Sequence, residues 1–228
     1  MLSAITSTQD MFTFLEQCAS SGENHLFRGV RKQSFKLTPS IGRRKTNKGK
    51  PFDAKAEQLM LKLFRQKAHS FVKDHLDDPL ALLSIAQHHG LPTRLLDWSK
   101  NPLVALYFAV RDDFARKEKI EDSLVYVYVP QQKVDLDKKV DPFTIKAVQR
   151  YIPKYWSPRI EAQMGLFTIH NNPNKAWVSK SVSQVTIKHD IRKDLKVALN
   201  KVGMHESALF PDMDGIARHI DWLRTDAF

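Results

Sequence analysis

The chain has 228 residues, of which 42% are hydrophobic and 27% charged, enough for one substantial domain with a core of its own. This composition excludes intrinsic disorder, and eight glycines with eleven prolines exclude a collagen-like chain. Thirty-six Lys and Arg against 25 Asp and Glu leave a net charge of +11, which favours anionic ligands or polyanions but names none of them.

Hydrophobic spacing predicts the elements of the first half of the chain. The helix over 52–73 carries apolar side chains along one face, among them Leu59, Leu63 and Phe71. A later helix starts at Pro102 behind Asn101, a favourable capping residue, and would bury the apolar face that includes Phe108. In chain order we expect a helix over 9–18, a strand over 25–30, a solvated basic loop over 43–50, the helix over 52–73, an apolar helix from 79 to a left-handed glycine cap at 90, and the helix from 102.

The second half adds strands and two helices. The helix over 190–202 would turn Leu195, Ala198, Leu199 and Val202 inward and stop at Gly203. The expected elements are strands over 123–129, 165–170 and 182–187, and helices over 190–202 and 213–222. The order is mixed rather than strictly alternating, and no linker divides the chain. We therefore predict one compact α+β domain over 1–228, with a mixed central sheet of about four to six strands and flanking helices.

Strong chemical motifs are missing from the sequence. It contains no GxxxxGK[ST], GxGxxG, HExxH or CxxC, and its one cysteine, Cys18, excludes a thiolate zinc site. His88 and His89 are adjacent, so on a helix they point about 100° apart and do not readily share a metal. We predict no metal site. The lone cysteine, the lack of an apolar run of about 18 residues and the lack of a basic leader lead us to expect a cytoplasmic protein without membrane contact.

Three segments carry polar residues in apolar surroundings. Arg28 lies within an apolar strand beside Gly29, which suggests a fixed guanidinium next to an open backbone edge, suited to an anion. The alternative is a structural pair with a carboxylate such as Asp97. Arg94, Asp97 and Ser99 lie where a strand ends and a helix starts, so they either cap that helix or face a site near its N-terminus.

The third segment alternates in the manner of a strand. Arg159, Glu161, Gln163 and Gly165 share the two-residue period of one strand face. This polar line is either the solvent side of the strand or one wall of a site.

The sequence resembles the FRG domain family, which is named for its Phe-Arg-Gly motif. The similarity runs from about residue 20 to 224, and it implies a largely uncharacterised domain that occurs in bacteria and phages. The segments that carry it are Phe27-Arg28-Gly29, 37–40 (LTPS), 86–99 (AQHHGLPTRLLDWS), 101–102 with 105–109 (NP and ALYFA), 163–167 (QMGLF) and 209–212 (LFPD).

A more distant resemblance links three of these segments to Arg-Ser-Glu type ADP-ribosyltransferases. Arg28-Gly29 is similar to the first-strand arginine and glycine of that class, Ser99 with 105–109 to its serine strand and following helix, and Glu161-Ala162-Gln163 to its late Glu-containing strand. This resemblance implies an ADP-ribosyltransferase-like fold with NAD as co-substrate. Arg28 would hold the pyrophosphate, the Gly29 backbone would bind the nicotinamide amide and Ser99 would position the catalytic side chain.

The sequence departs from that class at its final glutamate, where it has Gln163. A neutral amide supplies no charge to stabilise an oxocarbenium ion, so either Glu161 or Asp97 takes the acidic role, or NAD is bound without turnover. The predicted catalytic residues are Arg28, Ser99, Glu161, Gln163 and Asp97, and the predicted cofactor-binding residues are Arg28, Gly29, Arg94, His88, His89 and Phe108.

Three functions follow as hypotheses. The first is an ADP-ribosyltransferase-like transferase or NAD glycohydrolase that acts on a macromolecular target in bacterial or phage conflict, with 149–156 as a target contact. The second is a non-catalytic basic module that binds a nucleic acid or a nucleotide. The third is a hydrolase with His88 or His89 as general base and Asp97 as its orienting group.

Overall fold

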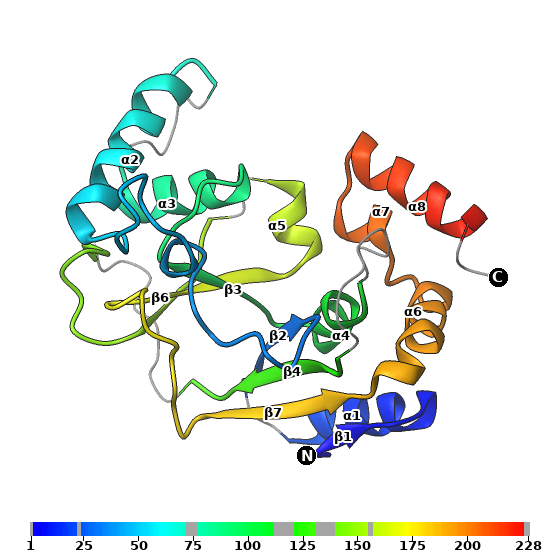
Figure 1. Cartoon of the computed structure of the whole chain (residues 1–228). Coiled ribbons are helices and arrows are strands. Elements are labelled where there is room, and N and C mark those ends of the chain that lie inside the picture. Colours follow the sequence, from blue (N-terminus) through cyan, green and yellow to red (C-terminus); the bar gives the residue numbers. More distant parts are fainter. Residues whose placement is uncertain are drawn as a thin grey trace.

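The structure is a computed structural model that describes residues 2–21, 24–71, 77–111, 121–130, 140–154 and 157–225 (Figure 1). Within these ranges the chain forms strands and helices in mixed order. The strands are β1 (Ala4–Ile5), β2 (Leu26–Val30), β3 (Leu95–Ser99), β4 (Ser123–Tyr128), β5 (Gln149–Tyr151), β6 (Gly165–Ile169) and β7 (Val182–Ile187). The helices are α1 (Thr8–Ser20), α2 (Ala54–Ala68), α3 (Pro79–His88), α4 (Pro102–Val110), α5 (Pro158–Ala162), α6 (Arg192–Lys201), α7 (Glu206–Leu209) and α8 (Met213–Thr225), with 3₁₀ turns η1 (Ile41–Arg43) and η2 (His189–Ile191).

The strands form a single mixed sheet in the order β1-β7-β4-β2-β3-β6-β5. β1 pairs with β7 in parallel, and every other neighbouring pair is antiparallel. The predicted α+β class with a mixed central sheet is confirmed. The sheet has seven strands rather than four to six, because the two edge strands β1 and β5 are too short to show a periodic pattern.

Helices cover one face of the sheet and loops cover the other. α1, α4 and α6 bury apolar side chains against β2, β4 and β7, and α2 and α3 pack over β3 and β6. Leu37 and Trp177, from loops, close the opposite face over Trp98 and Tyr126. In Figure 1, α3, α5 and α4 follow one another along the helical side of β3.

Local sequence signals fix the two helices that flank the centre of the sheet. The Asp78 carboxylate caps α3, and Pro79 occupies its first turn. Gly90 follows α3 with φ of 87°, the left-handed conformation expected of it. The Asn101 side chain accepts a hydrogen bond from the Leu103 amide and caps α4, with Pro102 as the first helical residue. The sequence predictions for Pro79, Gly90, Asn101 and Pro102 are confirmed.

Two helices differ from their expected faces. Leu59 and Leu63 of α2 are 58% and 48% exposed, and its buried residues are Glu57 and Leu61. The face with Leu59 and Leu63 is therefore not the inner face of α2. The inner face carries Leu61, the partly buried Phe64 and Glu57, the partner of a buried arginine described below. Val202 is 51% exposed because α6 ends before it, although the predicted inward residues Leu195 and Leu199 are buried.

None of the helices in the described ranges has the length and apolarity needed to cross a bilayer. Of the expected target-contact segment over 149–156, Tyr155 and Trp156 lie outside the described residues.

Candidate functional site

The site starts from a separation of two neighbouring strands. β2 pairs with β4 through all five of its residues, but with β3 only at Phe27 and Ser99. Beyond that pair, the guanidinium of Arg28 takes the place of the backbone ladder, because its Nη1 donates to the carbonyl oxygen of Asp97 at 2.7 Å. The strand edge is thus opened and held open by an arginine side chain.

A cavity of about 290 Å³ lies at this separation, between the sheet and α3, α4 and α5. Segments far apart in the sequence contribute its walls. The lining residues are Phe27, Arg28, Gly29, Ser84, Gln87, His88, Asp97, Trp98, Ser99, Val104, Ala105, Phe108, Arg159, Ile160, Gln163, Gly165, Leu166 and Phe167. The sheet and α3–α5 thus gather Arg28, Gly29, His88, Asp97, Ser99, Phe108 and Gln163 around one space, and they leave Arg94, His89 and Glu161 outside it.

Gly29 is explained by helix packing. A Cβ atom at this position would lie 1.8 Å from the carbonyl oxygen of Ala105 and 2.7 Å from the amide nitrogen of Ala109. Only glycine therefore allows α4 to lie this close to β2. The helix covers the face of the strand at Gly29, whereas β3 pairs with β2 only at Phe27, and Gly29 lines the cavity.

Asp97 provides a carboxylate at the cavity, and the side chains of Gln87 and Arg28 fix its orientation. Its side chain is 63% exposed and lies 3.5 Å from Nη1 of Arg28. The Gln87 amide donates to Oδ1 at 2.7 Å, and the Gln87 carbonyl accepts from the Thr93 hydroxyl, so the amide cannot turn round without losing both bonds. Arg28 therefore has an acidic partner, as the alternative interpretation required, but the pair borders a cavity and is not sealed in the core.

Ser99 and Gln163 lie at the cavity wall with their polar groups bonded to the fold. The Ser99 hydroxyl donates to the carbonyl oxygen of Gln163 at 2.7 Å and accepts from the amide of Asn101 at 2.9 Å. The Gln163 amide donates to the carbonyl oxygen of Leu209 at 3.0 Å. These bonds join β3, the start of α4, the end of α5 and α7.

The predicted strand through Arg159, Glu161, Gln163 and Gly165 is wrong. Ser157 caps a short helix, α5, that has Pro158 at its start, and the strand β6 begins only at Gly165 after Met164, which has φ of 45°. A helical turn separates side chains that a strand would align, so Glu161 is exposed and does not line the cavity, whereas Arg159 does.

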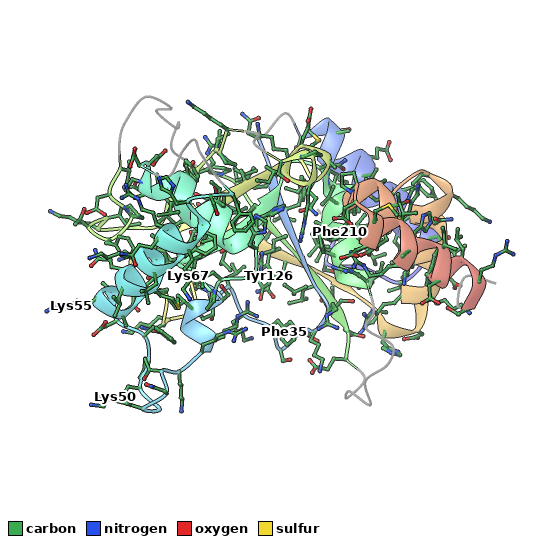
Figure 2. All side chains as sticks on the ribbon, turned by 90° about the horizontal axis from the view of Figure 1, so that it is seen from above. Phe35, Lys50, Lys55, Lys67, Tyr126 and Phe210 are labelled. Atoms are coloured by element: carbon green, nitrogen blue, oxygen red, sulfur yellow. The ribbon has the colours of Figure 1, made fainter. Side chains whose placement is uncertain are left out.

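Arg159 and His88 both line the cavity, and the positive charge of Arg159 acts on the His88 ring. The Arg159 guanidinium lies 4.4 Å from the ring centre of Phe210, which also stacks edge-on with Phe108 and lies between α4 and α8 (Figure 2). Burial lowers the pKa of Arg159. Burial, reinforced by the Arg159 charge, lowers the pKa of His88 to about 4, so His88 is neutral at pH 7 and a weak general base there.

Two predicted cofactor-binding residues lie elsewhere. Arg94 is 2% exposed and pairs with buried Glu57, with Nε 2.9 Å and Nη2 2.7 Å from the same carboxylate oxygen. It also donates to the carbonyl oxygen of Pro142. His89 is exposed just after α3. The Arg94 pair is structural and locks α2 to the start of β3.

The sequence prediction did not include Gln87 among the functional candidates. Gln87 belongs to the segment 86–99 that carries the family resemblance, so a signal for it existed. Arg159 belonged to the polar line that was expected to form either a solvent-facing surface or one wall of a site, and it does line the cavity, but from a helix and not from a strand. In the part of the chain that the structure describes, no three His, Cys, Asp or Glu side chains gather to hold a metal ion.

The family model described as FRG domain matches residues 23–118, which include β2, α3, β3 and α4. No curated protein and no solved structure matches the chain. The resemblance to ADP-ribosyltransferases therefore stays a prediction.

Proposed function

The chain carries an FRG domain, and on that premise we propose that its cavity binds NAD and cleaves the bond between nicotinamide and ribose. The observation that carries this proposal is the convergence of β2, β3 and the end of α5, three distant segments, on one cavity beside a split strand pair. Arg28, Asp97, Ser99 and Gln163 all line it.

The chemistry of the walls suits half of a dinucleotide. Guanidinium groups at Arg28 and Arg159 provide planar donors for pyrophosphate oxygens. Phe108 and Phe167 offer aromatic surface to a flat ring. A volume of about 290 Å³ lies at the small end of the roughly 300–1,000 Å³ of ligand sites, which fits nicotinamide and its ribose within the cavity and the remaining nucleotide at its mouth.

Asp97 takes the acidic role in this proposal. Its carboxylate would face the positive charge that develops on the ribose as the C1′–N bond breaks and the bonding electrons pass to the nicotinamide ring. Water or an acceptor nucleophile then forms the new bond to C1′ and releases its proton. Arg28 and Gln87 orient the carboxylate, and Glu161 plays no part because it lies outside the cavity.

The test is release of nicotinamide from NAD by the purified full chain. Asp97→Asn keeps the size of the side chain and its acceptor for Gln87 but removes the charge, so we expect at least a 100-fold lower rate, in the range of losses seen when one electrostatic stabiliser is removed. Glu161→Gln is the matched control and is expected to retain the parent rate. Loss of activity in Glu161→Gln with retention in Asp97→Asn would contradict the assignment of the acid.

A second candidate is a nucleotide sensor without turnover. It is favoured by the hydrogen bonds that hold Ser99 and Gln163 to backbone carbonyls, which leave neither of them free for a reaction. An NAD-dependent rise in Tm that Arg28→Ala abolishes, together with no release of nicotinamide, would support this function and exclude the enzymatic one. No release and no rise in Tm would reject both.

A further inference from the structure

The densest basic block of the sequence is folded into a small hairpin. Lys45 and Pro51 form an antiparallel bridge, the Thr46 amide donates to the carbonyl oxygen of Lys50 at 2.8 Å, and the Gly49 amide donates to that of Thr46 at 2.9 Å. Gly49 turns the chain with φ of 73°. We name residues 43–51 the basic hairpin. The expected solvated loop is confirmed, and its backbone is held in a defined turn.

The basic hairpin concentrates positive charge with almost no compensation. Residues 43–55 contain six basic side chains and one acidic one, Asp53, whose carboxylate is used to cap α2. Lys45, Lys48 and Lys50 are exposed, and among the described residues none of their ammonium groups has a carboxylate partner. Figure 2 shows Lys50 and Lys55 at the outer edge of the molecule beside α2.

The hairpin is anchored next to the cavity. The Ile41 amide donates to the carbonyl oxygen of Thr93, the residue two before β3, and Ser40 exchanges hydrogen bonds with Thr93. A Cβ atom on Gly42 would lie 1.7 Å from the carbonyl oxygen of Pro173, so the base of the hairpin is packed tightly. Burial, with the charge of Arg28, lowers the pKa of Arg43.

We propose that the basic hairpin docks the phosphate backbone of a nucleic acid. The turn is closed by one bridge and presents three exposed lysines, which would displace the counterions of several phosphates. A membrane surface fits less well, because the tip over 45–50 (KTNKGK) has no apolar side chain to insert. The tip also lacks the apolar anchors that protein interfaces concentrate at their centre.

Binding of a nucleic acid to the hairpin does not depend on the proposed function. Transfer of an ADP-ribosyl group to that nucleic acid does rest on the proposed function. A nucleic acid held there would present the acceptor for the ADP-ribosyl group. A nucleophilic base nitrogen or phosphate oxygen of the docked strand forms the bond to C1′, nicotinamide leaves with the electrons of the broken bond, and any acceptor proton passes to solvent.

The experiment measures binding of the full chain to a fluorescent 20-base-pair DNA duplex and to a 20-nucleotide RNA strand, by anisotropy without NAD. With about four phosphates contacted, affinity for the duplex should fall on the order of 100-fold between 50 and 200 mM salt. The triple variant Lys45→Ala, Lys48→Ala, Lys50→Ala should bind at least 10-fold more weakly and reduce the salt slope by about 2 to 3.

The control removes the same charge elsewhere. Lys193→Ala, Lys201→Ala and Arg224→Ala alter exposed residues of α6 and α8, at the opposite end of the molecule (Figure 1), and should change affinity by less than about 2-fold. Equal weakening by both triples, no binding of either probe at 50 mM salt, or equally tight hairpin-dependent binding to polyglutamate or to vesicles with 30% anionic lipid would overturn the proposal.

Nicotinamide release separates this proposal from the previous one. The hairpin triple should release nicotinamide from NAD at the parent rate when no nucleic acid is present, and Asp97→Asn should bind the duplex with the parent affinity. Loss of duplex binding in Asp97→Asn would place the contact at the cavity and contradict the docking surface on the hairpin.

Discussion

Gly29 determines how closely helix α4 can approach strand β2. The Cβ of an alanine would lie 1.8 Å from the carbonyl oxygen of Ala105, a backbone atom that cannot turn aside. We predict that Gly29→Ala lowers the free energy of unfolding by about 3 kcal/mol or more, because α4 or β2 must shift to make room. Urea denaturation of the purified variant measures this loss.

Gly165→Ala is the control for this prediction. Its Cβ would have its nearest neighbour, the carbonyl oxygen of Ile160, at 3.4 Å, so the loss should stay within about 1 kcal/mol. Equal losses in the two variants would mean that the general cost of replacing a strand glycine, and not contact with α4, explains Gly29.

Arg28 and Arg94 show how far individual residues could be predicted. Both lie in apolar surroundings, and from the sequence both are candidates for holding an anion. The structure separates them, since Arg94 is sealed against Glu57 while Arg28 borders the cavity. Glu57 is 37 positions away, on helix α2, so no local pattern could identify this pair.

The same limit applies to elements. Helices α3 and α4 were predictable because Asp78-Pro79 and Asn101-Pro102 are strong start signals. The segment over 159–165 alternates polar and apolar residues as a strand would, yet Ser157-Pro158 starts α5 there. Five residues are too few for the periods of 2 and 3.6 to be told apart. The resemblance to the late strand of ADP-ribosyltransferases then put Glu161 in the predicted site, although it lies on a helix outside the cavity.

Glu206 holds α8 and α4 together from the short helix α7. It is 8% exposed and accepts hydrogen bonds from Arg111 of the α4 terminus, from Arg218 of α8 and from the Tyr107 hydroxyl. We predict that Glu206→Gln destabilises the docking of α8 by about 2 kcal/mol, because the negative charge that Arg111 and Arg218 share is removed and their two guanidinium groups are left beside each other. Amide hydrogen exchange over 213–225 should become about 30-fold faster.

Asp221→Asn provides the comparison for Glu206→Gln on the same helix. Its side chain is exposed, so exchange over 213–225 should remain within about 2-fold of the parent. If both variants exchange alike, the helix is held by its apolar contacts and not by Glu206.

The fold class of the whole molecule could be predicted from the sequence, whereas the order of the strands in the sheet could not. Composition and mixed elements predict α+β with one sheet, and the structure confirms it. The pairing of β2 with both β3 and β4, and its early separation from β3, depend on contacts between residues about 70 to 100 positions apart. The cavity lies where these two strands separate. Several of its lining residues could therefore be predicted from the sequence, but the presence and position of the cavity could not.

Acid should destabilise the whole fold through His170, which is 1% exposed between the sheet and the loops. Burial, aided by the charges of Arg28 and Arg94, lowers its pKa to about 3, against about 6.5 in an unfolded chain. Between about pH 6.5 and pH 3, His170 is therefore protonated in the unfolded state but neutral in the folded state. The free energy of unfolding falls as the pH drops through this range. From pH 7 to pH 5 this one group should lower the free energy of unfolding by about 2 kcal/mol.

Urea denaturation as a function of pH tests this expectation. His170→Gln should lose that part of the pH dependence, whereas replacement of the exposed His69 by Gln should leave the pH dependence of the parent. Parallel curves for the parent and His170→Gln would show that His170 is not held neutral in the fold.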